Sequence, residues 1–327
     1  MRYTDRIYGE VEISETVILE LIKSPTIQRL KEIDQAGYSK PFFPGTAHSR
    51  FEHSLGVFCL LKIYGTSLEE QIAGLIHDVS HSAFSHCIDY VLDAGSEKEQ
   101  VHQDNVFAEF VKKSEIPAIL KKYNLDPDYI LNDKNFPLEE KKLPDLCADR
   151  IDYSLRTAVI FGGLNTDNVN YFLNNLVAEN NCWLFKDFES AKKYAELFLK
   201  LNTKYYSGIF SAVMFRTVGD YLKYALDKNY ISESDLYTTD KLVLSKIGNY
   251  LEKDKKLKLL FERMNNKVKF KNNPNDYDAQ VFCKSRVVDP LCDHNGEIKR
   301  VSEIDASWKA VLENELKPKE YFIKFER

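Results

Sequence analysis

Apolar residues recur at helical spacing along most of the chain. After Ser24-Pro25, for example, Ile27, Leu30 and Ile33 follow one another every third position until Gly37 ends the run. The segments with helical periodicity are 24–37, 53–65, 67–78, 146–163 and, as two long stretches, 190–226. Ser67 and Glu70 have the spacing of a capping box. The pattern therefore predicts a mostly helical body.

Strand-like alternation is confined to the two ends of the chain. Residues 1–15 alternate apolar and polar positions, which favours a short hairpin or edge strand, and alternation returns after residue 278. Between these ends, residues 40–51 and 96–145 are interrupted by prolines, which predicts loops and short helices. We expect a mainly α fold, with a helical domain over 1–225 and a smaller C-terminal α+β region over 226–327.

Composition narrows the class of protein. The 327 residues are 44% hydrophobic and 29% charged, which is typical of a globular protein, and the net charge of −5 argues against an extended nucleic-acid surface. The six cysteines form no CxxC pair, which favours reduced cysteines in a reducing compartment. No apolar run reaches the ~18 residues of a membrane span, and no secretory signal is evident. We therefore expect a cytoplasmic protein.

Histidines are concentrated in one part of the chain. Six of the seven lie between residues 48 and 102, and "GLIHD" places His77 and Asp78 at the end of an apolar helix. His53 and Asp149 are further candidate ligands on two other helices. Imidazole and carboxylate groups bind divalent transition metals, and burying them is costly without a partner. Two imidazoles and two carboxylates favour Mn, Fe, Co or Ni, with Mg and Zn as alternatives.

Four motifs carry a resemblance to a known family. "PGTAHSRFEHSLGV", "GLIHDVSHSAFSH", "VHQD" and "ADRIDY" follow the order and spacing of the HD-domain phosphohydrolases. The chain most resembles the branch of deoxynucleoside triphosphate (dNTP) triphosphohydrolases. The resemblance covers about residues 1–220, with a weaker echo in "SRVVDPL". It implies an HD-domain helical bundle that hydrolyses nucleotide phosphate esters, most specifically a dNTP to a deoxynucleoside and triphosphate.

The resemblance also implies roles for individual residues. It makes His53, His77, Asp78 and Asp149 the metal ligands. Arg50 resembles the family's phosphate-contacting arginine. His81, His86 and His102 resemble the histidines along the phosphate path, one of them the acid or nucleophile, with Asp89 orienting His81.

Further residues are candidates for binding the rest of the substrate. Tyr153 follows Asp149 by one helical turn and could stack on a sugar, while Arg150 could reach a phosphate. Lys204 and Tyr206 lie in "NTKYYSG", where Tyr206 resembles the family's base- or sugar-stacking tyrosine.

Two residues depart from the family's pattern. Ser80 stands where the family usually has glycine, and Gln103 where it usually has glutamate. The acid partner of His102 is therefore either missing or supplied by Asp104.

Other functions fit the same residues. A monophosphatase or phosphodiesterase would use the same metal site, and a nucleotide-binding regulatory module would keep it for binding. A triphosphate needs several cations beyond Arg50, for which the candidates are Arg150, Arg156, Lys204 and Arg216. The resemblance also implies a homo-oligomer.

Overall fold

The chain begins with the expected hairpin. The computed structural model describes residues 1–92 and 97–326, in which β1 (Arg2–Asp5) and β2 (Gly9–Glu12) pair antiparallel, with Arg2 opposite Glu12. Asp5 closes the turn, because its Oδ1 accepts hydrogen bonds from the backbone N–H groups of Ile7 and Tyr8 at 2.7 and 3.1 Å. The same carboxylate also reaches the helical body beneath the hairpin.

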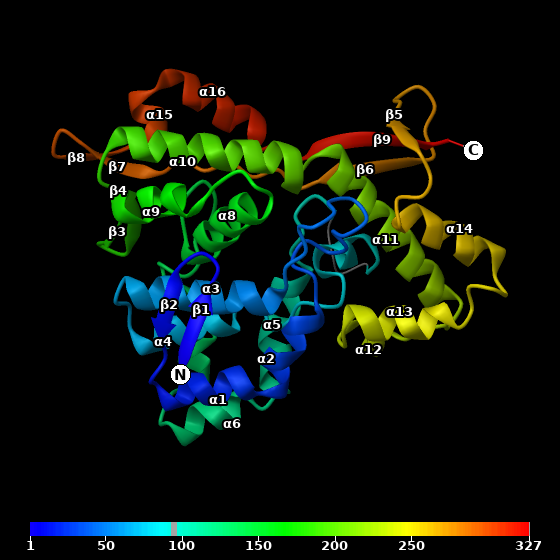
Figure 1. Ribbon diagram of the computed structural model, residues 1–327, viewed down its shortest axis with the longest axis horizontal. Helices are drawn as coiled ribbons and strands as arrows, with labels where there is room; N and C mark the ends of the chain where they lie inside the picture. Colours follow the sequence, from blue (N-terminus) through cyan, green and yellow to red (C-terminus); the bar gives the residue numbers. More distant parts are fainter. Residues whose placement is uncertain (93–96, 327) are drawn as a thin grey trace.

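Helices and connecting loops follow the hairpin (Figure 1). In chain order they are α1 (Thr16–Lys23), α2 (Pro25–Arg29), the 3₁₀ turn η1 (Leu30–Glu32), α3 (Arg50–Ile63), α4 (Leu68–Ile76), η2 (Ser85–Tyr90), α5 (His102–Lys112), α6 (Ile116–Lys122), α7 (Pro127–Ile130), η3 (Asp133–Asn135) and α8 (Ala148–Ile160). The helix expected over 24–37 is shorter than predicted. The backbone becomes extended at Ile33, and Asp34 then pairs with Ser49 in an isolated antiparallel bridge.

A capping box begins α3 rather than α4. Ser49 and Glu52 form the reciprocal bonds of that motif at the start of α3. Of the two hydrogen bonds expected for a capping box at Ser67 and Glu70, only one is formed. Ser67 Oγ does accept from Glu70 N, but Glu70 Oε1 accepts from the N–H groups of Leu138 and Glu139. Glu70 therefore ties α4 to the segment that leads into α8.

The remaining elements include two long helices, α10 and α11. In chain order these elements are α9 (Thr166–Asn175), β3 (Leu176–Glu179), β4 (Cys182–Phe185), α10 (Phe188–Leu201), the π turn η4 (Asn202–Tyr206), α11 (Ile209–Asp227), α12 (Glu233–Leu236), α13 (Asp240–Gly248), α14 (Lys255–Met264), β5 (Phe270–Asn272), β6 (Ala279–Cys283), β7 (Leu291–His294), β8 (Glu297–Arg300), α15 (Val301–Ile304), α16 (Ala306–Glu315) and β9 (Lys319–Phe325). The mainly α class with a C-terminal α+β region is confirmed. No helix among the described residues is long and apolar enough to cross a membrane.

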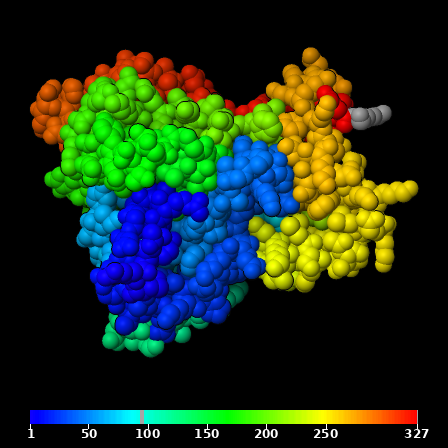
Figure 2. Space-filling model, in the orientation of Figure 1, coloured from blue at the N-terminus to red at the C-terminus, as the bar shows by residue number. Residues whose placement is uncertain are grey.

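The C-terminal region is packed against the helical body. Strand β7 pairs parallel with β4, so that Leu184 lies opposite Leu291, within a sheet of order β3-β4-β7-β8. A second sheet, β5-β9-β6, packs on α11. In Figure 2 the C-terminal residues, yellow to red, cover the right side and upper edge of this face. The domain boundary after residue 225 stays a prediction, and one hydrophobic core joins residues from both sides of it.

Helices α3 and α8 approach each other closely at Gly56. A Cβ atom at this position would lie 2.0 Å from Arg156 Nη2 and 2.1 Å from Asp152 Oδ1. Both of those side chains are fully buried and hydrogen-bonded to each other. Only glycine leaves room for this pair, because a close-packed interior cannot absorb an added methyl group without displacing its neighbours.

Replacing Gly56 by alanine should therefore destabilise the protein by about 1–3 kcal/mol, the usual cost of overpacking a core. Gly248, at the end of α13, is a matched helical control, since a Cβ atom added there would have no neighbour within 4 Å. Thermal unfolding should show a lowered Tm for Gly56→Ala and an unchanged or higher Tm for Gly248→Ala. Equal Tm values for the two variants would contradict this account.

Candidate metal centre

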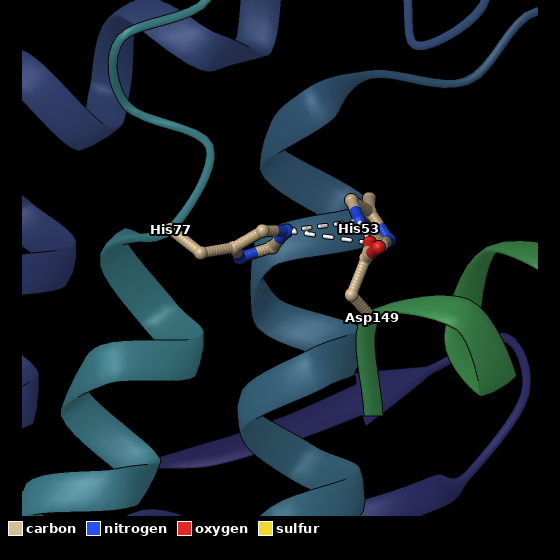
Figure 3. A group of neighbouring side chains, drawn as sticks. All are labelled: His53, His77 and Asp149. Carbon is tan, nitrogen blue, oxygen red and sulfur yellow. Dashed lines mark hydrogen bonds and ion pairs between the residues drawn. The ribbon is translucent and has the colours of Figure 1, made fainter. Parts of the chain in front are cut away.

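Three helices bring the candidate ligands together at one point. His53 lies in the first turn of α3, His77 directly follows α4, and Asp149 lies in the first turn of α8 (Figure 3). The three side chains point toward one another from these different elements. Periodicity alone predicted the helices, whereas their meeting point depends on how the helices pack.

The donor atoms lie at the spacing of ligands on one ion. His53 Nε2 is 2.8 Å from Asp149 Oδ1 and 3.2 Å from His77 Nε2, and His77 Nε2 is 3.5 Å from Asp149 Oδ1. The Asp78 carboxylate is 3.5 Å from His77 Nε2 and 3.7 Å from His53 Nε2. Ligands bound at ~2.1 Å and at right angles are about 3 Å apart. Two imidazoles and two carboxylates therefore fit a divalent ion.

Asp152 fixes the orientation of His53. The Nδ1 atom of His53 lies 2.7 Å from Asp152 Oδ2 and donates to it, which leaves Nε2 facing Asp149 and His77. Burial lowers the pKa of His53, but the hydrogen bonds to Asp149 and Asp152 outweigh it and raise the pKa overall. Sequence reasoning missed Asp152, although its position three residues after Asp149 puts the two carboxylates on neighbouring faces of α8.

His77 is oriented in the same way by the backbone. Its Nδ1 lies 2.8 Å from the carbonyl oxygen of Gly74 and donates to it, so that Nε2 is directed at His53. In both histidines the nitrogen that faces the centre is therefore the one left free to bind a metal.

Arg50 holds Asp78 in place. Its Nη1 lies 2.6 Å from Asp78 Oδ2, while Nε donates to Ser85 Oγ and Nη2 to the carbonyl oxygen of Gln35. Burial alone would raise the pKa of Asp78, but neighbouring positive charges, of which Arg50 has the largest effect, lower it overall. The structure thus places Arg50 beside the candidate centre, bound to a candidate ligand, and its contact with phosphate stays a prediction.

The pairing expected for Asp89 is wrong. Asp89 Oδ2 lies 3.5 Å from His86 Nδ1, and its Oδ1 accepts from the backbone N–H of His102. The turn η2 puts His86 and Asp89 three residues apart on one side, whereas His81 precedes this turn. His81 instead lies 3.3 Å from Asp78, and its ring packs edge-on against His86 at 5.1 Å.

His102 has a partner that sequence reasoning did not anticipate. Its Nε2 lies 2.9 Å from the hydroxyl of Tyr237, in the segment between α12 and α13. Asp104, expected as a substitute acid for His102, contacts the side-chain amide of Gln103 instead. The two residues that depart from the family's pattern also meet, because Ser80 Oγ donates to the carbonyl oxygen of Gln103 at 3.1 Å.

Tyr153 lies beside the centre, as its spacing from Asp149 predicted. Its ring is 6.4 Å from that of His53 and 5.4 Å from that of Tyr206. Tyr206 also packs against Phe198, so its ring belongs to a hydrophobic cluster as well. The exposed Lys204 lies over the ring of Tyr205. Stacking on a base or sugar stays a prediction for both tyrosines.

The arginines proposed for phosphate binding have partners within the protein. Arg156 is buried and bound to Asp152 and Asp5, so the expectation that it faces a phosphate is wrong. Arg216 pairs with Asp220 four residues along α11.

Arg150 is held mainly by the backbone. It is buried and donates to the carbonyl oxygens of Asp145 and Lys141 at 2.6 and 3.1 Å. Helical spacing did not predict these two partners, because both lie in the loop that precedes α8.

A family model and several known proteins match the chain. The HD domain model matches residues 50–156. The uncharacterised protein YdhJ of Bacillus subtilis is 35% identical over 89% of this chain and 88% of its own length. The metal-dependent phosphohydrolase cns2 of Cordyceps militaris is 39% identical over 53% of this chain and 50% of its own length. The mouse deoxynucleoside triphosphate triphosphohydrolase SAMHD1 is 34% identical over 38% of this chain and 22% of its own length.

Solved structures share the fold along the whole chain. A hypothetical protein from Aquifex aeolicus has a TM-score of 0.73 at 20% identity, with 99% of this chain and 96% of that chain covered. A phosphohydrolase from Bacteroides thetaiotaomicron has a TM-score of 0.70 at 18% identity, with both chains fully covered.

Asp152→Asn should weaken metal binding by about 10- to 100-fold, because the outer partner of a ligating histidine sets its tautomer and orientation. Asp5→Asn is a matched control, since Asp5 also pairs with Arg156 but does not contact His53. Both variants should lose stability. In a metal titration by calorimetry only Asp152→Asn should lose affinity, and equal affinities for the two variants would assign Asp152 a purely structural role.

Proposed function

Because this chain belongs to the HD-domain family of metal-dependent phosphohydrolases, we propose that it hydrolyses dNTPs to a deoxynucleoside and triphosphate. The observation that carries the proposal is the convergence of His53, His77 and Asp149, with Asp78 held beside them by Arg50. The named similarity to SAMHD1 supports a dNTP as substrate.

The four candidate ligands suit a divalent ion of the Mn, Fe, Co or Ni group, with Mg and Zn as alternatives. Such an ion lowers the pKa of coordinated water and polarises phosphoryl oxygens when it is bound. Asp152 and the Gly74 carbonyl then keep the two imidazoles in the tautomer that leaves Nε2 free. Burial of His53, Asp78 and Asp152 excludes bulk water from their surroundings and strengthens each of these contacts.

His86 and Asp89 form the best arranged pair for proton delivery. Burial lowers the pKa of His86. The Asp89 carboxylate, which lies beside His86 Nδ1, opposes this effect and favours the protonated ring. His86 also touches His81, which in turn lies beside Asp78, so a proton on His86 is close to the candidate centre. In this arrangement Arg50 holds Asp78 at the centre, His81 positions the phosphate, and Tyr153 faces the sugar.

A phosphomonoesterase is the second candidate. The observation in its favour is that Arg156 and Arg216, two of the cations expected for a triphosphate, are paired with carboxylates inside the protein. A monophosphate carries fewer negative charges and needs fewer cations. A phosphodiesterase would use the same centre. The contact of Ser80 with Gln103 also leaves open a regulatory module with little turnover.

Product analysis separates these functions. The purified protein, loaded with Mn²⁺, should release deoxynucleoside and tripolyphosphate from a dNTP, as resolved by ion-exchange chromatography. His77→Ala combined with Asp78→Ala should lose the bound metal and reduce turnover by several orders of magnitude, because two of the four ligands are gone. Inorganic phosphate released from a dNMP alone would favour the monophosphatase. Activity retained without metal would overturn both enzymatic proposals.

Replacing His86 by alanine should lower kcat by about 10²- to 10⁴-fold while leaving the metal content unchanged, as expected for a lost general acid. Asp89→Asn should reproduce part of this loss, since it removes the charge beside His86 Nδ1. His102→Ala is the comparison, because His102 contacts Tyr237 rather than a carboxylate. A larger loss from His102→Ala than from His86→Ala would move the acid to His102.

A further inference from the structure

Two cations from the C-terminal region lie near the candidate centre on the segment that joins two strands. Residues 284–290 connect β6 to β7 and belong to no helix or strand. Lys284 and Arg286 are half-buried there, and they alternate with the fully buried Cys283, Ser285 and Val287. This alternation of burial puts Lys284 and Arg286 on the same, less buried side of the segment.

Hydrogen bonds hold this segment against the helical body. The side chain of Asn202, buried in the π turn between α10 and α11, donates to Ser285 Oγ and accepts from the backbone N–H of Arg286, both at 2.9 Å. Farther along, Asp289 N donates to the carbonyl oxygen of Pro144, four residues before α8. The backbone that carries the two cations is therefore fixed in position.

The guanidinium of Arg286 reaches toward the histidines of the site. Its Nη2 donates to Gln100 Oε1 at 3.1 Å, and Gln100 is buried two residues before His102. Burial lowers the pKa of His86, and the charges of Arg50 and Arg286 lower it further, so both guanidinium groups act on this ring. From His86 the contacts continue through His81 to Asp78.

No carboxylate among the described residues is bonded to Lys284 or Arg286. Across residues 1–92 and 97–326, Lys284 has no hydrogen bond or ion pair from its side chain, and Arg286 contacts no carboxylate. Burial, helped by the charge of Arg286, lowers the pKa of Lys284 to about 8, although the nearby but unbonded carboxylates of Asp104 and Glu140 act in the opposite direction. Like charges brought together in a partly buried place, without a bonded acidic partner, are typical of an anion site.

We propose that Lys284 and Arg286 bind the outer phosphates of a polyphosphate substrate whose inner phosphate lies at the candidate metal centre. The proposal rests on the function proposed above and makes it more specific. The two residues would replace Arg156 and Arg216, the cations that have partners inside the protein, and would favour a nucleoside triphosphate over a monophosphate. The C-terminal region would thereby determine substrate class for a centre built by the HD domain.

Binding of inorganic tripolyphosphate tests this role separately from turnover. Lys284→Ala and Arg286→Ala should each weaken its binding by about 10- to 100-fold, the effect of a lost charge-assisted hydrogen bond, and the double variant by more. Binding of inorganic phosphate and metal content should not change. Lys271→Ala, at an exposed lysine on β5, is the matched control and should bind as the wild type does.

Charge-preserving variants guard against a folding defect. Lys284→Arg combined with Arg286→Lys should restore most of the affinity for tripolyphosphate if charge is what matters. In steady-state kinetics the alanine variants should raise KM for a dNTP. Wild-type affinity for tripolyphosphate in the double alanine variant would overturn the proposal, as would no measurable binding by the wild type.

The same experiment separates the two proposals from each other. A wild-type protein that cleaves no nucleoside triphosphate would overturn the proposed dNTP triphosphohydrolase function. The tripolyphosphate arm would still decide whether Lys284 and Arg286 form an anion site.

Discussion

The carboxylate of Asp152 is the constraint on which the arrangement of the site depends. It accepts from His53 Nδ1 and from Arg156, and Arg156 in turn binds Asp5 in the N-terminal hairpin. These groups are buried, so each charge needs the others to offset the cost of leaving water. Gly56 gives the network its room, because any side chain there would occupy the position of Arg156. The hairpin, α3 and α8 are thereby locked together, and His53 faces the centre as a result.

Residues of the C-terminal region contact the loops that carry the histidines of the site. Arg29 donates to the carbonyl oxygens of Val79 and His81 on one side and of Tyr237 and Thr238 on the other. The loop that carries His81 is therefore tied to the segment whose Tyr237 hydroxyl contacts His102. A backbone held by a guanidinium loses little further freedom when substrate binds, which is the general benefit of a preorganised site. This tie gives the region after residue 225 a part in positioning the site.

The arginines and lysines near the site differ in whether they have a partner within the protein, which residue type alone does not show. Arg156, Arg216 and Arg150 look equivalent in the sequence, yet each is committed to partners within the protein. Lys284 and Arg286 come from a segment about 130 residues beyond the HD motifs and have no carboxylate partner among the described residues. A cation with an internal partner stabilises the fold, whereas one without such a partner remains available to an anion.

The sequence by itself determined the helical class, the N-terminal hairpin, the family and the group of histidines and aspartates that form the candidate centre. These follow from local periodicity and from motifs whose residues lie close together in the chain. Only the tertiary structure decided that Asp89 pairs with His86, that Asp152 orients His53, and that Lys284 and Arg286 approach the site. Most of these contacts join residues far apart in the chain. Their geometry is set by how helices and strands pack, because helical spacing identifies partners within one helix but not partners from distant segments.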